Sequence, residues 1–300
     1  MKHYLDIRDW STPELDELLR LAVYLKTEWK SGGNKPVLGG KVLAMVFQKP
    51  SLRTRVSFEV AMTHLGGTAI MLGPSEIGLG KRESIADVSR VLSGYSQGIM
   101  ARVFEHQHVL ELAEYASVPV INGLSDDLHP CQALADILTV YEKFGTLKGL
   151  KLAFIGDGNN VARSLLNACA AFGMDFSIAS PQGYELPDVQ NFPMATEIMV
   201  TATHDATTAV QDADVIYTDT WVSMGQEDEV KARLAQFEDY QVNEDLLGHA
   251  KPDAIVLHCL PAHRGQEITD EVADGAQSAI FSQAENRLHA QKAILVHLMR

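Results

Sequence analysis

The sequence predicts an α/β protein with two doubly wound domains, each a mainly parallel sheet covered by helices on both faces. Short apolar runs of strand type alternate with helix-type segments along the chain, and this alternation is typical of parallel sheets. The alternation stops at residues 145–149 and then starts again. A chain of 300 residues is also long enough for two domains.

The first array is expected to contain four strands. Its first helix, 11–30, begins at Ser-Thr-Pro and repeats leucines at helical spacing. The expected strands are 41–47, 68–73, 98–104 and 118–123, and the helices that follow them are 51–65, 83–93, 106–116 and 130–144. We interpret residues 1–136 as the first domain, joined to the second by a linking helix at about 130–144.

The second array also begins with a strand and a helix. Its expected strands are 151–157, 176–181, 214–221 and 254–261, and its expected helices are 161–173 and 286–300. Residues 197–200 and 207–210 flank a further loop. We interpret 149–284 as the second domain and 285–300 as a C-terminal helix that returns to the first. In such sheets, ligands bind at the carboxyl ends of the strands.

The composition limits the classes of partner. With 25 Lys and Arg against 39 Asp and Glu, the formal net charge is −14, which argues against a nucleic-acid partner. Three scattered cysteines without a CxxC pair fit a reducing compartment, and no metal-ligand spacing is present. The N-terminus has no apolar signal region, and no apolar run is long enough to span a membrane. We therefore expect a cytoplasmic protein without a metal or other cofactor.

Residues 47–55, FQKPSLRTR, form a short basic stretch in this acidic chain. Ser51 follows an expected strand and opens a helix, which by itself makes it an ordinary N-cap. Arg53 and Arg55 stand in the first turn, where the helix dipole favours acidic residues. Backbone N–H groups, hydroxyls and guanidinium groups together suit a phosphate. We predict an anion site here, although the P-loop pattern GxxxxGK[ST] is absent.

Arg102 lies inside an apolar strand. A buried arginine needs either a ligand or a structural ion pair, and the residues alone leave both alternatives open.

Four motifs carry a family resemblance along essentially the whole chain. They are SLRTR (51–55), HPCQ (129–132), DTWVSMG (219–225) and HCLP (258–261). In this order, each just past an expected strand, they resemble those of the ornithine carbamoyltransferases. The resemblance implies transfer of the carbamoyl group of carbamoyl phosphate to the δ-amine of L-ornithine, giving L-citrulline and phosphate in arginine biosynthesis. It also implies a homotrimer, or a multiple of one.

The resemblance assigns one group of residues to carbamoyl phosphate: Ser51, Leu52, Arg53, Thr54, Arg102, His129, Gln132 and Arg287. Ser51, Arg53 and Thr54 are expected to hold the phosphate. Arg102, His129 and Thr54 are expected to polarise the carbamoyl oxygen, which becomes negative as an amine attacks.

A second group is assigned to ornithine: Asn160, Asp219, Ser223, Met224, Cys259 and Leu260. Asn160 is expected to bind the α-carboxylate, and Asp219 with Ser223 and Met224 the α-amino group. Cys259 and the Leu260 carbonyl are expected beside the δ-amine, with Cys259 catalytic alongside Arg102 and His129. The Leu260–Pro261 peptide is expected to be cis.

Two positions depart from the family pattern. Leu52 replaces the more frequent Thr, at a position that contributes mainly backbone. Gly78 stands where many relatives carry a Gln that is supplied to the neighbouring subunit's site, and Gly78 cannot make that contact.

Three alternative functions follow from the sequence. The acceptor could be putrescine or N-acetylornithine, since acetylornithine relatives also carry SLR. GDGNN (156–160) stands where a Rossmann protein has its dinucleotide loop, which predicts an NAD(P)-binding enzyme, although Val161 replaces the third Gly of that fingerprint. A catalytically silent paralogue is the third alternative, but it predicts loss of Arg53, His129 or Cys259, and all three are present.

Overall fold

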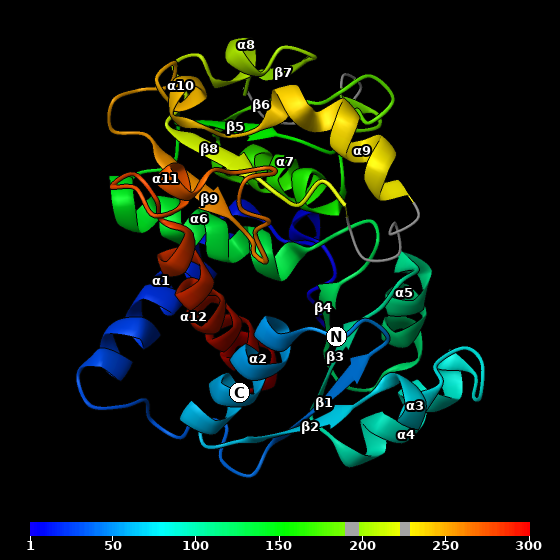
Figure 1. Ribbon diagram of the computed structural model, residues 1–300. Helices are drawn as coiled ribbons and strands as arrows, with labels where there is room; N and C mark the ends of the chain where they lie inside the picture. The colour runs from blue at the N-terminus through cyan, green and yellow to red at the C-terminus, as the bar shows by residue number, and fades with distance from the viewer. Residues whose placement is uncertain (190–197, 223–228) are drawn as a thin grey trace. The chain divides into compact units, whose positions relative to one another are not determined.

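The chain forms two compact units in a computed structural model that describes residues 1–189, 198–222 and 229–300 (Figure 1). Unit 1 consists of Met1–Leu138 and Glu285–Arg300, and unit 2 of Thr139–Ala284. The divisions fall inside two helices, α6 (Pro130–Phe144) and α12 (Ile280–Met299).

Unit 1 is built on a four-stranded sheet in the order β2-β1-β3-β4, with every pair parallel. Its strands are β1 (Val42–Phe47), β2 (Thr68–Leu72), β3 (Gly98–Arg102) and β4 (Val120–Leu124). The chain moves to β2 on one side of β1 and returns to β3 on the other, so the topological switch point lies between β1 and β3. The carboxyl ends of these two strands are where a doubly wound sheet binds its ligand.

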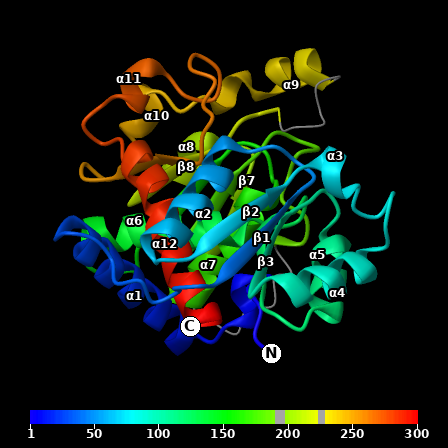
Figure 2. The ribbon, with the colours of Figure 1, turned by 90° about the horizontal axis from the view of Figure 1, so that it is seen from below.

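Helices cover both faces of this sheet (Figures 1 and 2). The helices of unit 1 are α1 (Thr12–Lys30), α2 (Leu52–His64), α3 (Pro74–Ile77), α4 (Ile85–Tyr95), α5 (His106–Tyr115) and the parts of α6 and α12 that belong to it. Alternate side chains of β1 and β3 pack against α4 and α5 in one buried apolar cluster, whereas α1, α2 and α12 lie on the opposite side.

Unit 2 has a five-stranded parallel sheet in the order β7-β6-β5-β8-β9. Its strands are β5 (Lys151–Ile155), β6 (Asp175–Ala179), β7 (Val200–Thr203), β8 (Val215–Thr218) and β9 (Ile255–His258). Its helices are α7 (Asn160–Phe172), α8 (Ala206–Val210), α9 (Val230–Phe237), α10 (Glu244–Leu247) and α11 (Asp270–Ala273). The switch point of this sheet lies between β5 and β8. The predicted fold class is confirmed.

Several elements differ from those predicted. β7 lies where the sequence predicts only a loop with flanking segments. It is not predicted because it is a partly exposed edge strand without an apolar run. The sequence does not predict α9 either, because few of its residues are buried and its apolar pattern is weak. α12 begins at Ile280 instead of 286, and α3 lies within the expected loop 74–81. No helix in the described part of the chain has both the length and the apolar composition needed to cross a membrane.

Candidate active site

The switch point of unit 1 brings the basic stretch next to Arg102. Phe47 and Arg102 pair across β1 and β3 at their carboxyl ends, and the chain then turns into α2. Ser51 is the N-cap of α2, where its Oγ accepts a hydrogen bond from the Thr54 N–H at 3.2 Å. The ordinary capping role of Ser51 is therefore real, and it places the side chains of the first turn of α2 at the end of the sheet where ligands bind.

Arg287 connects residues that are far apart in the sequence. Its Nη1 donates to Gln132 Oε1 at 2.6 Å, and its Nη2 donates to Thr54 Oγ1 at 3.1 Å. All three side chains are buried. The Gln132 amide in turn donates to Asp136 at 2.8 Å. Side chains from α2, α6 and α12 are thus held in one hydrogen-bonded group.

His129 lies among three arginines. It is buried at the start of α6, and burial lowers its pKa well below the usual 6.5. The positive charges of Arg287, Arg102 and Arg53 lower this pKa further, in that order. Such an effect requires the charges to be close. The charges of Arg53, Arg102 and Arg287 therefore act on the His129 ring, and Arg287 is itself held by Gln132 and Thr54.

The protonation of His129 is testable. A lowered pKa makes the imidazole neutral at pH 7. The contribution of His129 to the free energy of unfolding is therefore fully present above about pH 6.5, and it is lost as the pH falls towards the folded-state pKa. A bound phosphate should raise this pKa, because it offsets the neighbouring positive charges. We expect NMR of ¹⁵N-histidine to show a neutral His129 ring at pH 6.5, and a higher titration midpoint with inorganic phosphate. A ligand-free midpoint of 6.5 or more would contradict this.

In unit 2, the loops after β5 and β8 meet at the carboxylate of Asp219. Asn159 Nδ2 donates to Asp219 Oδ2 at 2.9 Å, and the Cys259 thiol donates to Asp219 Oδ1 at 2.9 Å. The Thr220 N–H donates to the same Oδ1 at 2.8 Å. Asn160, the next residue after Asn159, is half-buried at the start of α7. The predicted residues Asn160, Asp219 and Cys259 thus gather at the carboxyl ends of β5, β8 and β9.

Asn159 does more than form part of the loop after β5. Its Oδ1 accepts the N–H groups of Val161 and Ala162 at 2.9 and 3.1 Å and caps α7. With Oδ1 fixed by these donors, Nδ2 points to Asp219. The signal in the sequence is the pair of asparagines in GDGNN, of which only one is needed as a cap.

A buried pair supports the loop that carries Cys259. His258 Nδ1 accepts the Leu260 N–H at 2.8 Å, so its proton is on Nε2, which donates to Glu267 at 3.0 Å. Both side chains are fully buried. Leu260–Pro261 is cis, which confirms the prediction. Glu267 is difficult to recognise in the sequence, because its only signal is that it lies nine residues after the histidine of a motif.

Asp219, His258 and Cys259 could also be considered as metal ligands, because their donor atoms lie within 4.8 Å of one another. Both ring nitrogens of His258 are already hydrogen-bonded. Binding a metal there would break one of these bonds.

The geometry argues against the dinucleotide alternative. The Gly158 N–H donates to the Tyr184 carbonyl at 2.8 Å, and a Cβ on Gly158 would lie 2.2 Å from the Leu186 backbone nitrogen. The chain itself therefore fills the space beside the glycine loop. Asn159 also occupies the N–H groups at the start of α7, which a pyrophosphate would need.

The remaining predicted positions have different surroundings. The Leu52 side chain is 74% exposed, which fits a contribution from backbone alone. Gly78 ends α3 with φ 51°, and a Cβ there would lie 2.8 Å from Cβ of Arg82. Ser223 and Met224 lie outside the described residues.

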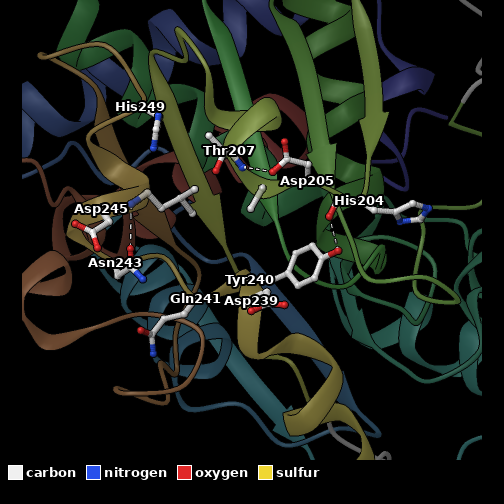
Figure 3. A pocket seen from close by; sticks show the side chains of 11 residues that line it. His204, Asp205, Thr207, Asp239, Tyr240, Gln241, Asn243, Asp245 and His249 are labelled. Carbon is white, nitrogen blue, oxygen red and sulfur yellow. Dashed lines mark hydrogen bonds between the residues drawn. The ribbon is translucent and has the colours of Figure 1, made fainter.

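A separate hollow in unit 2 has a cavity volume of about 440 Å³. It is lined by side chains that follow β7 and by the segment 239–249, including His204, Asp205, Tyr240 and His249 (Figure 3). The Tyr240 hydroxyl donates to the His204 carbonyl at 2.6 Å, and Asp205 caps α8. Several of its polar groups thus serve the fold, and none of the residues predicted for the site lines it.

The chain belongs to the aspartate/ornithine carbamoyltransferase family. The carbamoyl-P binding domain of that family matches residues 2–142, and the Asp/Orn binding domain matches residues 148–298.

Its relatives include proteins named ornithine carbamoyltransferase. The one from Anoxybacillus flavithermus (strain DSM 21510 / WK1) is 53% identical over 303 residues, covering 99% of this chain and 96% of the relative. The structure of the ornithine carbamoyltransferase from Pyrococcus furiosus superposes with a TM-score of 0.95 at 52% identity, covering 99% of this chain and 97% of that one. An acetylornithine transcarbamylase complexed with acetylcitrulline is more distant, with a TM-score of 0.86 at 34% identity over 100% of both chains.

Proposed function

We propose that this protein transfers the carbamoyl group of carbamoyl phosphate to the δ-amine of L-ornithine, producing L-citrulline and phosphate for arginine biosynthesis in the cytoplasm. The observation that carries the proposal is the buried hydrogen-bonded group of Thr54, Gln132 and Arg287 in unit 1, where the charges of Arg287, Arg102 and Arg53 act on His129. Arg102 and Arg287 are buried and Arg53 is half-buried, and such a group of cations suits a dianionic substrate. The identity of 53% with a protein named ornithine carbamoyltransferase supports the choice of acceptor.

Unit 1 is proposed to bind carbamoyl phosphate. The phosphate takes the N-terminus of α2, with the Ser51 and Thr54 hydroxyls, the Leu52 backbone and the Arg53 guanidinium. Arg102, His129 and Thr54 donate to the carbamoyl oxygen, which gains negative charge as the amine attacks. Gln132 orients the carbamoyl NH₂. Arg287 holds Gln132 and Thr54 in place through the two hydrogen bonds that it donates.

Unit 2 is proposed to bind ornithine. Asn160 binds the α-carboxylate, and Asp219 binds the α-amino group with Ser223 and Met224. The δ-amine arrives as an ammonium ion and must lose a proton before it can attack. The Cys259 sulfur takes this proton while the thiol passes its own proton to Asp219 Oδ1, to which it is hydrogen-bonded. The Leu260 carbonyl orients the amine. The amine then attacks the carbamoyl carbon and forms a tetrahedral intermediate. As it collapses, the bond from carbon to the phosphate oxygen breaks, and the extra proton of the attacking nitrogen leaves with the phosphate.

The purified protein is tested with carbamoyl phosphate and four acceptors in parallel. We expect citrulline from L-ornithine, and less than about 1% of that rate from N-acetylornithine, putrescine or aspartate, because Asp219 needs a free α-amino group and Asn160 a carboxylate. Absence of citrulline would refute the proposal. A higher rate with N-acetylornithine or putrescine would change the acceptor but not the family.

Asn159 offers a test of how Asp219 is held. Asn159→Asp keeps an oxygen for the helix cap, but removes the donor to Asp219 and places a second negative charge beside it. We expect the KM for ornithine to rise about tenfold or more, with the KM for carbamoyl phosphate unchanged. Asn159→Ala should additionally reduce the free energy of unfolding by about 1 kcal/mol, because the cap is lost. Steady-state kinetics and urea unfolding measure the two effects, and equal KM values for Asn159→Asp and the unchanged protein would exclude this role.

The active particle is proposed to be a homotrimer or a multiple of one. Leu52 and Val56 on α2 and Ile70 on the edge strand β2 are 74%, 46% and 51% exposed. Exposed apolar side chains of this kind favour burial against another chain. Light scattering after gel filtration should give the mass of three chains or a multiple of three, and a monomer or dimer would contradict the proposal.

A further inference from the structure

Arg233 is a buried arginine with no assigned role. It lies in α9 and is only 6% exposed. Its Nη1 donates to Asp157 Oδ2 at 2.9 Å and to the Trp221 carbonyl at 3.1 Å. Its Nε donates to Glu229 at 2.8 Å, and the guanidinium lies over the Tyr184 ring, 4.7 Å from the ring centroid. A single guanidinium thus joins four segments of unit 2.

Two of these partners stand in the loops that form the candidate ornithine site. Asp157 follows β5, two residues before Asn159, and Trp221 follows β8, two residues after Asp219. Asn159 and Asp219 are hydrogen-bonded to each other. The two loops are therefore connected twice, directly through Asn159 and Asp219 and indirectly through Arg233. The connection through Arg233 holds one loop just before Asn159 and the other loop just after Asp219.

Arg233 also supplies a charge where two carboxylates are close. Burial raises the pKa of Asp157, Arg233 lowers it, and the negative charge of Asp219 raises it again. Removing the guanidinium would leave Asp157, whose side chain is only 12% exposed, without its cation and near the carboxylate that is proposed to bind an ammonium group. A buried group in this position either takes up a proton or moves towards water, and either change displaces the loop that carries Asn159.

We propose that Arg233 is a positioning residue for the amino-acid substrate, which locks the loops after β5 and β8 so that Asp219 and Asn160 face the ligand. The inference rests on the proposed function. It requires that Arg233 acts on ornithine binding and not on carbamoyl phosphate, whose proposed residues all belong to unit 1.

Arg233→Met tests this inference, because methionine keeps most of the apolar volume and removes the hydrogen bonds to Asp157, Trp221 and Glu229. We expect the KM for ornithine to rise by about 30-fold or more, since two of these bonds join charged groups, with the KM for carbamoyl phosphate within twofold. Arg233→Lys can keep the bond to Asp157 but not the fork geometry, so its KM should be intermediate. It also serves as the second variant if methionine prevents folding.

Arg264→Met is the matched control, because Arg264 pairs with Asp270 and Asp274 on the surface of the same unit.

A second substitution separates positioning from a general loss of structure. Arg233→Met leaves Asp157 without its cation, so the KM for ornithine should stay raised whether or not Asp157 holds a proton. Adding Asp157→Asn to Arg233→Met removes the unpaired acid and should recover part of the KM for ornithine. The inference fails if both KM values rise equally, if only the melting temperature falls, or if adding Asp157→Asn leaves the KM for ornithine unchanged. Turnover of ornithine by the unchanged protein, measured in the same assay, tests the proposed function separately.

Discussion

Replacing Arg53 with alanine should raise the KM for carbamoyl phosphate by about 100-fold, and lower kcat as well. Arg53 is half-buried in the first turn of α2, and its charge acts on His129 together with Arg102 and Arg287. A guanidinium that pairs with a phosphate contributes about 1.5–3 kcal/mol, which corresponds to a factor of roughly 10 to 150 in affinity. The KM should respond most, because the phosphate is bound before and during the reaction.

Arg55→Ala is the control for this prediction. Arg55 lies two residues further along α2, is exposed, and forms an ion pair with Glu59 at 3.0 Å. Surface pairs of this kind contribute little, so both kinetic constants should change less than twofold. Equal effects of the two substitutions would show that the local positive charge matters but that no specific phosphate contact is made by Arg53. Steady-state kinetics with carbamoyl phosphate as the varied substrate makes the comparison.

Replacing Cys259 with alanine should lower kcat for ornithine by about 100- to 1000-fold, with the KM for carbamoyl phosphate almost unchanged. The thiol donates to Asp219 at 2.9 Å, and the two groups together are the proposed acceptor of the ammonium proton. Loss of a group that takes up a proton in the reaction lowers the rate by a factor of about 10² to 10⁴. Higher pH should recover part of the rate, because more of the substrate amine is then already deprotonated.

Cys169→Ala controls for the loss of a thiol. Cys169 is buried in α7 of the same unit, so its replacement should reduce stability modestly and leave kcat unchanged. If Cys259→Ala keeps full activity from pH 7 to 9, the thiol has no part in proton transfer, and another group must accept the proton. Rates measured over this pH range with saturating carbamoyl phosphate distinguish the two results.

The order of strands and helices could be read from the sequence because it depends on local properties. Apolar runs, helix caps and glycine-containing turns act over a few residues, and they predicted eight of the nine strands that the described residues form, near their observed positions. The missing strand, β7, lies at a sheet edge and is partly exposed, so its composition carries little signal. Arg102 stands out in the sequence as an arginine inside an apolar strand, whereas Asp219 and Cys259 are assigned through the family resemblance.

The sequence by itself thus determined the fold class and the residue types available for chemistry, because both are set by short-range patterns. Only the tertiary structure decided which of these residues meet. Arg287 reaches Thr54 across 233 positions, and Arg233 reaches Asp157 across 76. Such contacts depend on how sheets and helices pack, and no local periodicity encodes them. The same applies to the low pKa of His129, which results from burial and from arginines that arrive from three separate segments of the chain.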